Sequence, residues 1–93
     1  MGRYSVTFSE RAKKDLTFLH KSGDKSIAKR IERIFEELGE NPYSGIGKPE
    51  QLKGNLAGLW SRCIDKKHRL VYQIIEHTVT VFVIAAKGHY DDK

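Results

Sequence analysis

The fold is decided by the stretch Thr78-Val79-Thr80-Val81-Phe82-Val83-Ile84-Ala85-Ala86, which is apolar at most positions. In an extended chain, the valines at 79, 81 and 83 share one side, and residues 82 and 84 share the other. A strand that is apolar on both sides is typical of the centre of a sheet covered on both faces. Two further strands are predicted before it, at residues 59–64 and 68–75, with turns at 65–67 and 76–77.

The N-terminal half predicts one strand and two helices. Tyr4, Val6 and Phe8 alternate with polar residues, which indicates a short strand with one buried side. Ser9 is placed to cap a helix that runs to about residue 20, and Asp24 is placed to cap a second one. The second helix is expected to stop at Gly39, and its apolar stripe is Ile27, Ile31, Ile34, Phe35 and Leu38, with Glu37 among the outward-facing charges. The order β-α-α-β-β-β predicts an α+β fold with two N-terminal helices packed on an antiparallel sheet.

Length and charge limit the function further. The 93 residues predict a single domain over 1–93, and residues 41–58 are expected to form a long ordered loop. Seventeen Lys and Arg against twelve Asp and Glu give a net charge of +5, which favours an anionic partner such as RNA, DNA or an acidic protein. The single cysteine excludes an internal disulfide. No apolar run approaches a membrane span and no export signal is visible, so a cytoplasmic location is expected.

Chemically useful side chains gather in the half of the chain that is predicted to be sheet. They occur in Gly47-Lys48-Pro49-Glu50-Gln51-Leu52-Lys53, Trp60-Ser61-Arg62, His68-Arg69-Leu70-Val71-Tyr72 and His89-Tyr90. A carboxylate, an imidazole and fixed cations are sufficient to break a phosphodiester without a metal. No pair among His20, His68 and His77 has ligand spacing with Cys63 or a carboxylate, so a zinc site is not expected. The acid–base chemistry needs no metal or organic cofactor, and none is expected.

These four segments, in this order and spacing, resemble YoeB-type toxins of bacterial toxin–antitoxin modules, within the RelE/ParE superfamily. The resemblance extends over about residues 3–90 and implies a RelE/ParE-like fold with a sheet like that of microbial RNases. It further implies a ribosome-dependent mRNA interferase that cuts in the A site, is often a homodimer, and is neutralised by a small antitoxin.

The resemblance implies a role for each candidate residue. Glu50 stands where the family has its general base, Arg69 where an arginine stabilises the charge of the transition state, and His89 where the general acid lies. Lys48, Lys53, Arg62 and Tyr90 are the candidates for binding RNA or its phosphates. The residues themselves are compatible with these roles, because Glu50 between two lysines stays ionised at pH 7 and a guanidinium binds two phosphate oxygens. The alternatives are a solvated ion pair for Glu50, a structural ion pair for Arg69 and a frayed terminus for His89.

The chain departs from the family pattern at two places. The family usually has a second arginine at the position of Cys63, and related toxins commonly end at His-Tyr, whereas this chain continues with Asp91-Asp92-Lys93. In one hairpin register Cys63 lies opposite Arg69, and in the other Ile64 does. In the first register, one cation fewer would face the phosphate, and slower cleavage by the same mechanism is expected.

Three other functions stay open from the sequence. A ParE-like toxin would poison DNA gyrase, although such proteins generally lack this set of residues. A catalytically weakened homologue would only bind an antitoxin. A ribosome-independent RNase is the third.

Overall fold

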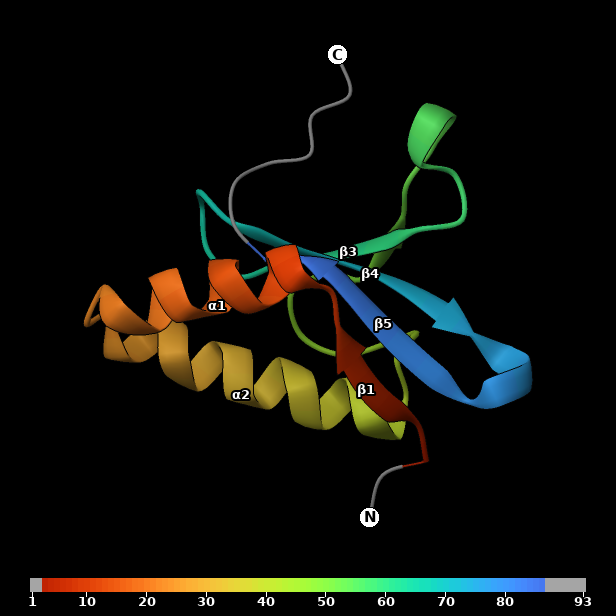
Figure 1. Ribbon diagram of the computed structural model, residues 1–93, viewed down its shortest axis with the longest axis horizontal. Coiled ribbons are helices and arrows are strands. Elements are labelled where there is room, and N and C mark those ends of the chain that lie inside the picture. The colour runs from red at the N-terminus through yellow and green to blue at the C-terminus, as the bar shows by residue number, and fades with distance from the viewer. Residues whose placement is uncertain (1–2, 87–93) are drawn as a thin grey trace.

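The protein is described by a computed structural model over residues 3–86 (Figure 1). Its helices are α1 (Glu10–Lys21) and α2 (Lys25–Glu40), with short 3-10 turns at Gly54–Leu56 and Glu76–Thr78. Its strands are β1 (Ser5–Phe8), β2 (Glu50–Gln51), β3 (Trp60–Cys63), β4 (Arg69–Ile75) and β5 (Thr80–Ala85). The α+β class and the helix pair expected from the sequence are therefore confirmed.

Both predicted helix caps are present. The Ser9 hydroxyl accepts a hydrogen bond from the Ala12 amide at 3.0 Å, which satisfies one of the free amides at the start of α1. The Asp24 carboxylate accepts from the amides of Ser26 and Ile27 at the start of α2. These bonds lower the pKa of Asp24, the hydroxyl of Ser26 being the largest contributor. Helix α2 continues one residue past Gly39 and ends at Glu40.

The sheet is mixed rather than purely antiparallel, which corrects the expected arrangement. Its strand order is β1-β5-β4-β3-β2, and Figure 1 shows β1 beside β5. Strand β1 pairs with β5 in parallel, with Ser5 opposite Thr80, while the other neighbours are antiparallel. The reason is geometric: the α1–α2 hairpin carries the chain away from β1, and the last strand fills the place next to it in the same direction.

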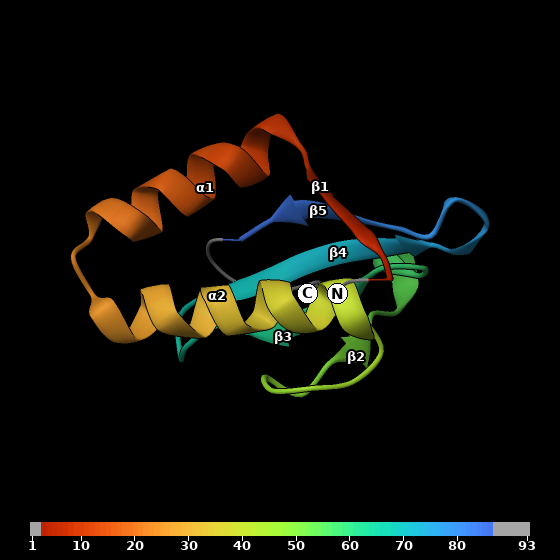
Figure 2. The same cartoon turned by 90° about the horizontal axis from the view of Figure 1, so that it is seen from below.

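The core lies between the helix pair and one face of the sheet. Helix residues Leu19, Ile34 and Leu38 join Tyr72 and Val83 from the strands in one buried cluster. In the view of Figure 2, α1 lies in the upper part and α2 in the lower part, with β1 and β5 drawn between them. Since side chains alternate along a strand, residues 71, 73 and 82 point to the other face. That second face is the one that carries the candidate site.

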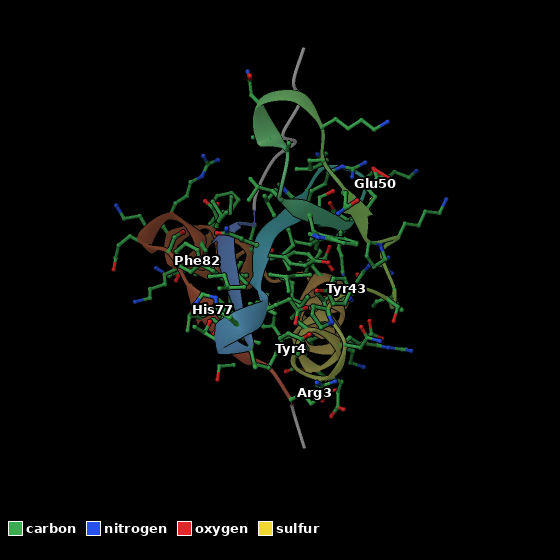
Figure 3. All side chains as sticks on the ribbon, turned by 90° about the vertical axis from the view of Figure 1, so that its right-hand side faces the viewer. Arg3, Tyr4, Tyr43, Glu50, His77 and Phe82 are labelled. Carbon is green, nitrogen blue, oxygen red and sulfur yellow. The ribbon has the colours of Figure 1, made fainter. Side chains whose placement is uncertain are left out.

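A cluster of tyrosines joins three distant segments at one end of the sheet. The hydroxyls of Tyr4 and Tyr43 both donate to the Glu76 carboxylate, and Figure 3 shows Tyr4 and Tyr43 on the same end of the molecule. The hydrogen bond to Glu76 raises the pKa of Tyr43 to about 12. In return, the two phenols lower the pKa of Glu76. This cluster ties the start of β1 and the loop after α2 to the β4–β5 turn.

Candidate active site

Glu50 lies on β2, a two-residue edge strand that the sequence pattern did not predict. Glu50 is opposite Ser61 and Gln51 is opposite Trp60 in an antiparallel pair with β3. Just before β2, the Gly47 carbonyl accepts a hydrogen bond from the Cys63 amide at 2.8 Å. The segment expected to be wholly loop is thus attached to the sheet at this point. Figure 3 shows Glu50 at the sheet edge, away from Tyr4 and Arg3.

The structure brings Glu50 and Arg69 together from different strands. Arg69 Nη1 lies 3.8 Å from Glu50 Oε2, and the same nitrogen donates to the Ser61 hydroxyl at 3.3 Å. The Glu50 side chain is 59% exposed and that of Arg69 is 28% exposed. A carboxylate and a guanidinium are therefore accessible side by side on the face opposite the helices. One can accept a proton, while the other can bind an anion.

The hairpin register places Cys63 directly opposite Arg69. The pairs are Trp60–Tyr72, Ser61–Val71, Arg62–Leu70 and Cys63–Arg69. The connecting turn is held by Asp65, whose carboxylate accepts from the amides of Lys67 and His68 at 2.8 and 2.7 Å. Of the two registers considered from the sequence, the one with Ile64 opposite Arg69 is excluded. A thiol thus occupies the position next to Arg69, where the resembling family usually has a second cation.

Besides Arg62, the other residues predicted for this site are Lys48, Lys53, His89 and Tyr90. Lys48 and Lys53 are exposed on the chain segments before and after β2. Lys48 has a positive φ of 51°, an uncommon conformation for a residue other than glycine. His89 and Tyr90 lie outside the described residues.

Arg62 does not belong to this surface, and its assignment to phosphate binding is wrong. It faces the opposite side of β3 from Ser61 and is 0% exposed. Its Nη1 lies 2.8 Å from Glu37 Oε1, its Nε donates to the Tyr72 hydroxyl at 3.2 Å, and its Nη2 donates to the Ser44 carbonyl. The cation is saturated by protein groups, so a phosphate cannot reach it.

Glu37 is the partner that sequence reasoning placed on the solvent side of α2. Its side chain is only 24% exposed, and Oε1 also accepts from the Ile46 amide at 2.9 Å. Burial alone would raise the pKa of Glu37, but the Ile46 amide and the Arg62 guanidinium outweigh it, so the pKa is lowered. For Arg62, though not for Glu37, a sequence signal existed, because the alternation of β3 puts Arg62 on the same side as Trp60, which packs partly buried against the core.

No group of three or more His, Cys, Asp or Glu side chains among residues 3–86 is arranged to hold a metal ion. No helix in the same range combines the length and the apolar character that crossing a membrane requires.

Comparison with known proteins identifies the family. A sequence model described as "YoeB-like toxin of bacterial type II toxin-antitoxin system" matches residues 8–90. The chain belongs to the YoeB-like toxin family. Toxin YoeB of Mycobacterium bovis is 45% identical over 86 residues, covering 92% of this chain and 98% of that toxin. Toxin YoeB of Streptomyces coelicolor is 39% identical over 85 residues, covering 91% and 98%.

Solved structures of YoeB-like toxins share the fold. A YoeB/ParE toxin from Agrobacterium tumefaciens superposes with a TM-score of 0.84 at 31% identity, covering 92% of this chain and 99% of that one. A YoeB dimer from Staphylococcus aureus superposes with a TM-score of 0.79 at 37% identity, covering 95% and 99%. A YoeB–YefM complex from the same organism has a TM-score of 0.77 at 36% identity, with the same coverage. The chain is thus a toxin of the type II toxin–antitoxin class.

Proposed function

We propose that this YoeB-like toxin is a ribosome-dependent mRNA endoribonuclease that cuts in the A site by metal-free acid–base catalysis. The observation that carries the proposal is the 3.8 Å separation between the Glu50 carboxylate and the Arg69 guanidinium on an accessible face of the sheet. The two groups come from strands that are distant in the sequence, yet they are spaced so that one phosphodiester can contact both. The net charge of +5 favours the approach to RNA.

In this mechanism Glu50 accepts the proton of a ribose 2′-hydroxyl as that oxygen attacks the neighbouring phosphorus. Arg69 exchanges its contact with Glu50 for the non-bridging phosphate oxygens and stabilises the charge that develops on them. His89 would protonate the 5′-oxygen as its bond to phosphorus breaks. The products would be a 3′-phosphate, first as the 2′,3′-cyclic ester, and a free 5′-hydroxyl. Lys48, Lys53 and Tyr90 would hold the RNA.

The partners follow from the same proposal. The ribosome supplies the mRNA in the A site, and acting there requires a cytoplasmic location. A toxin that is 36% identical to this chain has been solved in a YoeB–YefM complex. We therefore propose that a small antitoxin neutralises this chain. A homodimer is proposed on the same ground, from the dimeric toxin of Staphylococcus aureus.

The test is cleavage of mRNA on purified ribosomes, mapped by primer extension. Glu50→Ala should slow cleavage by about 10²- to 10⁴-fold, the usual contribution of a general base. Gln51→Ala is the matched control, because the same edge strand points this exposed side chain to the other face. Equal cleavage by wild type and Glu50→Ala would refute the role of Glu50. If the wild-type protein cuts no mRNA but inhibits DNA supercoiling by gyrase, the proposed endoribonuclease function is refuted.

A further inference from the structure

The loop that leads from α2 to β2 is anchored from inside the protein. The Tyr72 hydroxyl donates to the Pro42 carbonyl at 3.0 Å, Arg62 donates to the Ser44 carbonyl, and the Ile46 amide donates to Glu37. Alternate residues of the loop are thus attached to groups on the helix-facing side of the sheet. We call the side chains of Glu37, Arg62 and Tyr72 the loop anchor.

The three side chains of the loop anchor are linked through Arg62. The Arg62 guanidinium bonds both other members, at 2.8 Å to Glu37 and 3.2 Å to Tyr72. Among residues 3–86, no buried side-chain nitrogen or oxygen lacks a partner. A fully satisfied polar network in a low-dielectric interior is rigid, since each member loses bonds if another moves.

Two glycines show how closely the loop is fitted to this anchor. Gly45 has a φ of 130°, and a Cβ added there would overlap the Glu37 carboxylate. Gly47 has a φ of 83°, and its Cβ would lie 2.7 Å from the Cys63 carbonyl oxygen. Both φ values favour glycine, and neither position has room for a side chain. The backbone of the loop therefore packs directly against the Glu37 carboxylate at Gly45 and against the Cys63 backbone at Gly47.

Glu50 depends on this anchoring because β2 is short. In this strand only Glu50 and Gln51 pair with β3, so the pairing between the two strands alone does little to fix the position of β2. Only three residues separate Ile46, whose amide the Glu37 carboxylate holds, from Glu50, and the first of them, Gly47, is held by the Cys63 amide. A shift of the loop would therefore move the Glu50 carboxylate relative to Arg69, which is positioned independently on β4.

We propose that Glu37 and Arg62 are positioning residues, which set the place of Glu50 through the loop although both side chains lie on the other side of the sheet. The inference rests on the proposed function, since it assigns a purpose to the position of its general base. Displacement by a fraction of an ångström at a reacting group lowers the rate without a matching loss of binding.

The main test uses Glu37→Gln, which keeps the shape of the side chain but removes the charge that pairs with Arg62. The matched control is Glu36→Gln, the same chemical change at the exposed neighbouring position of α2. Each variant is compared with wild type in single-turnover cleavage of mRNA on ribosomes, at a temperature where thermal melts show it folded. Glu37→Gln should lower the maximal rate about tenfold or more, while the ribosome concentration for half-maximal rate changes less than about twofold.

A double variant separates positioning from general damage. In a Glu50→Ala background, Glu37→Gln should lower the residual rate by less than about twofold, because the group it positions is gone. An equal loss in both backgrounds would overturn the inference. So would a wild-type rate for Glu37→Gln. Gly47→Ala, which leaves the ion pair intact but displaces the loop, should reproduce the same pattern.

Amide hydrogen exchange tests whether the loop anchor holds β2 in place, and this test does not require that the proposed function is correct. The Leu52 amide donates to the Leu59 carbonyl at 2.9 Å directly after β2 and does not touch the loop anchor. If the anchor holds β2 in place, Glu37→Gln should speed exchange at Leu52 by about tenfold or more, with core strand β5 unchanged. Unchanged exchange at Leu52 would refute the coupling. Normal cleavage of mRNA by Glu50→Ala would refute only the role of Glu50 as general base and would leave the coupling between the loop anchor and β2 standing.

Discussion

Replacing Arg62 by methionine should cost this protein a large part of its stability. The side chain is completely buried, and its guanidinium supplies donors to Glu37, Tyr72 and the Ser44 carbonyl. Removing one partner of a buried ion pair typically costs about 3–5 kcal/mol, because the other charge stays behind unpaired. Glu37 is 24% exposed, so water reaches part of its carboxylate, and the lower end of this range applies. The free energy of unfolding should therefore fall by about 3 kcal/mol.

That loss is large for a domain of this size. At about 0.05–0.15 kcal/mol per residue, a chain of 93 residues has a total stability of roughly 5–14 kcal/mol. A loss of about 3 kcal/mol should lower the melting temperature by about 12–24 °C. Urea denaturation followed by circular dichroism measures the free energy, and a thermal melt measures the second quantity.

Arg33→Met provides the control on the same carboxylate. Arg33 Nε lies 3.3 Å from Glu37 Oε2, but the Arg33 side chain is 66% exposed. Exposed pairs at this helix spacing contribute about 0.3–0.5 kcal/mol, so Arg33→Met should change stability by no more than that. If Arg62→Met loses less than about 1 kcal/mol, or no more than Arg33→Met, the buried network does not stabilise the fold as argued.

Three further predictions concern the site and the pH response. Arg69→Gln should slow ribosomal mRNA cleavage by about 10²- to 10³-fold, and Arg69→Lys should recover only part of it, since lysine lacks the planar fork; a rate near wild type would exclude Arg69 from the mechanism. Cys63→Arg places a second cation opposite Arg69 and should speed cleavage by about threefold to tenfold in the same assay. An unchanged or lower rate would show that the cysteine at this position does not limit the rate of cleavage. The pKa of Glu37 is lowered from 4.5, so its stabilising contribution is complete above about pH 4.5 and is lost as the pH falls through the lower, folded-state value. Urea denaturation between pH 6 and pH 3 should therefore show wild type losing its advantage over Glu37→Gln, and a difference independent of pH would contradict this.

Most of the fold was predictable because local signals were strong. Ser9 and Asp24 cap their helices as their residue types favour, and the three later strands lie where the apolar runs predicted. Strand β2 was not predictable, since a pair of polar residues, Glu50 and Gln51, has no periodicity to detect. The parallel pairing of β1 with β5 is a property of the complete topology, and nothing in either strand specifies it.

The candidate site was predictable in its members but not in its geometry. Motif spacing singled out Glu50 and Arg69, but only the register of β2, β3 and β4 makes them neighbours. Arg62 was misassigned because arginine is rarely buried, and a cation beside a catalytic motif is more often exposed. Its burial depends on Glu37, which lies 25 residues earlier on another element. A compensating charge at such a distance leaves no pattern in a single sequence.

The pairing of β1 with β5 also bears on how the toxin is made. Ser5 is joined to Thr80, 75 positions later in a chain of 93 residues. Synthesis proceeds from the N-terminus, so the first strand emerges early and has no place in the sheet until nearly the whole polypeptide has been translated. Such non-local pairing also slows folding once the chain is released. A cell that produces this protein therefore has a period after translation begins in which the nascent toxin is still without its finished sheet.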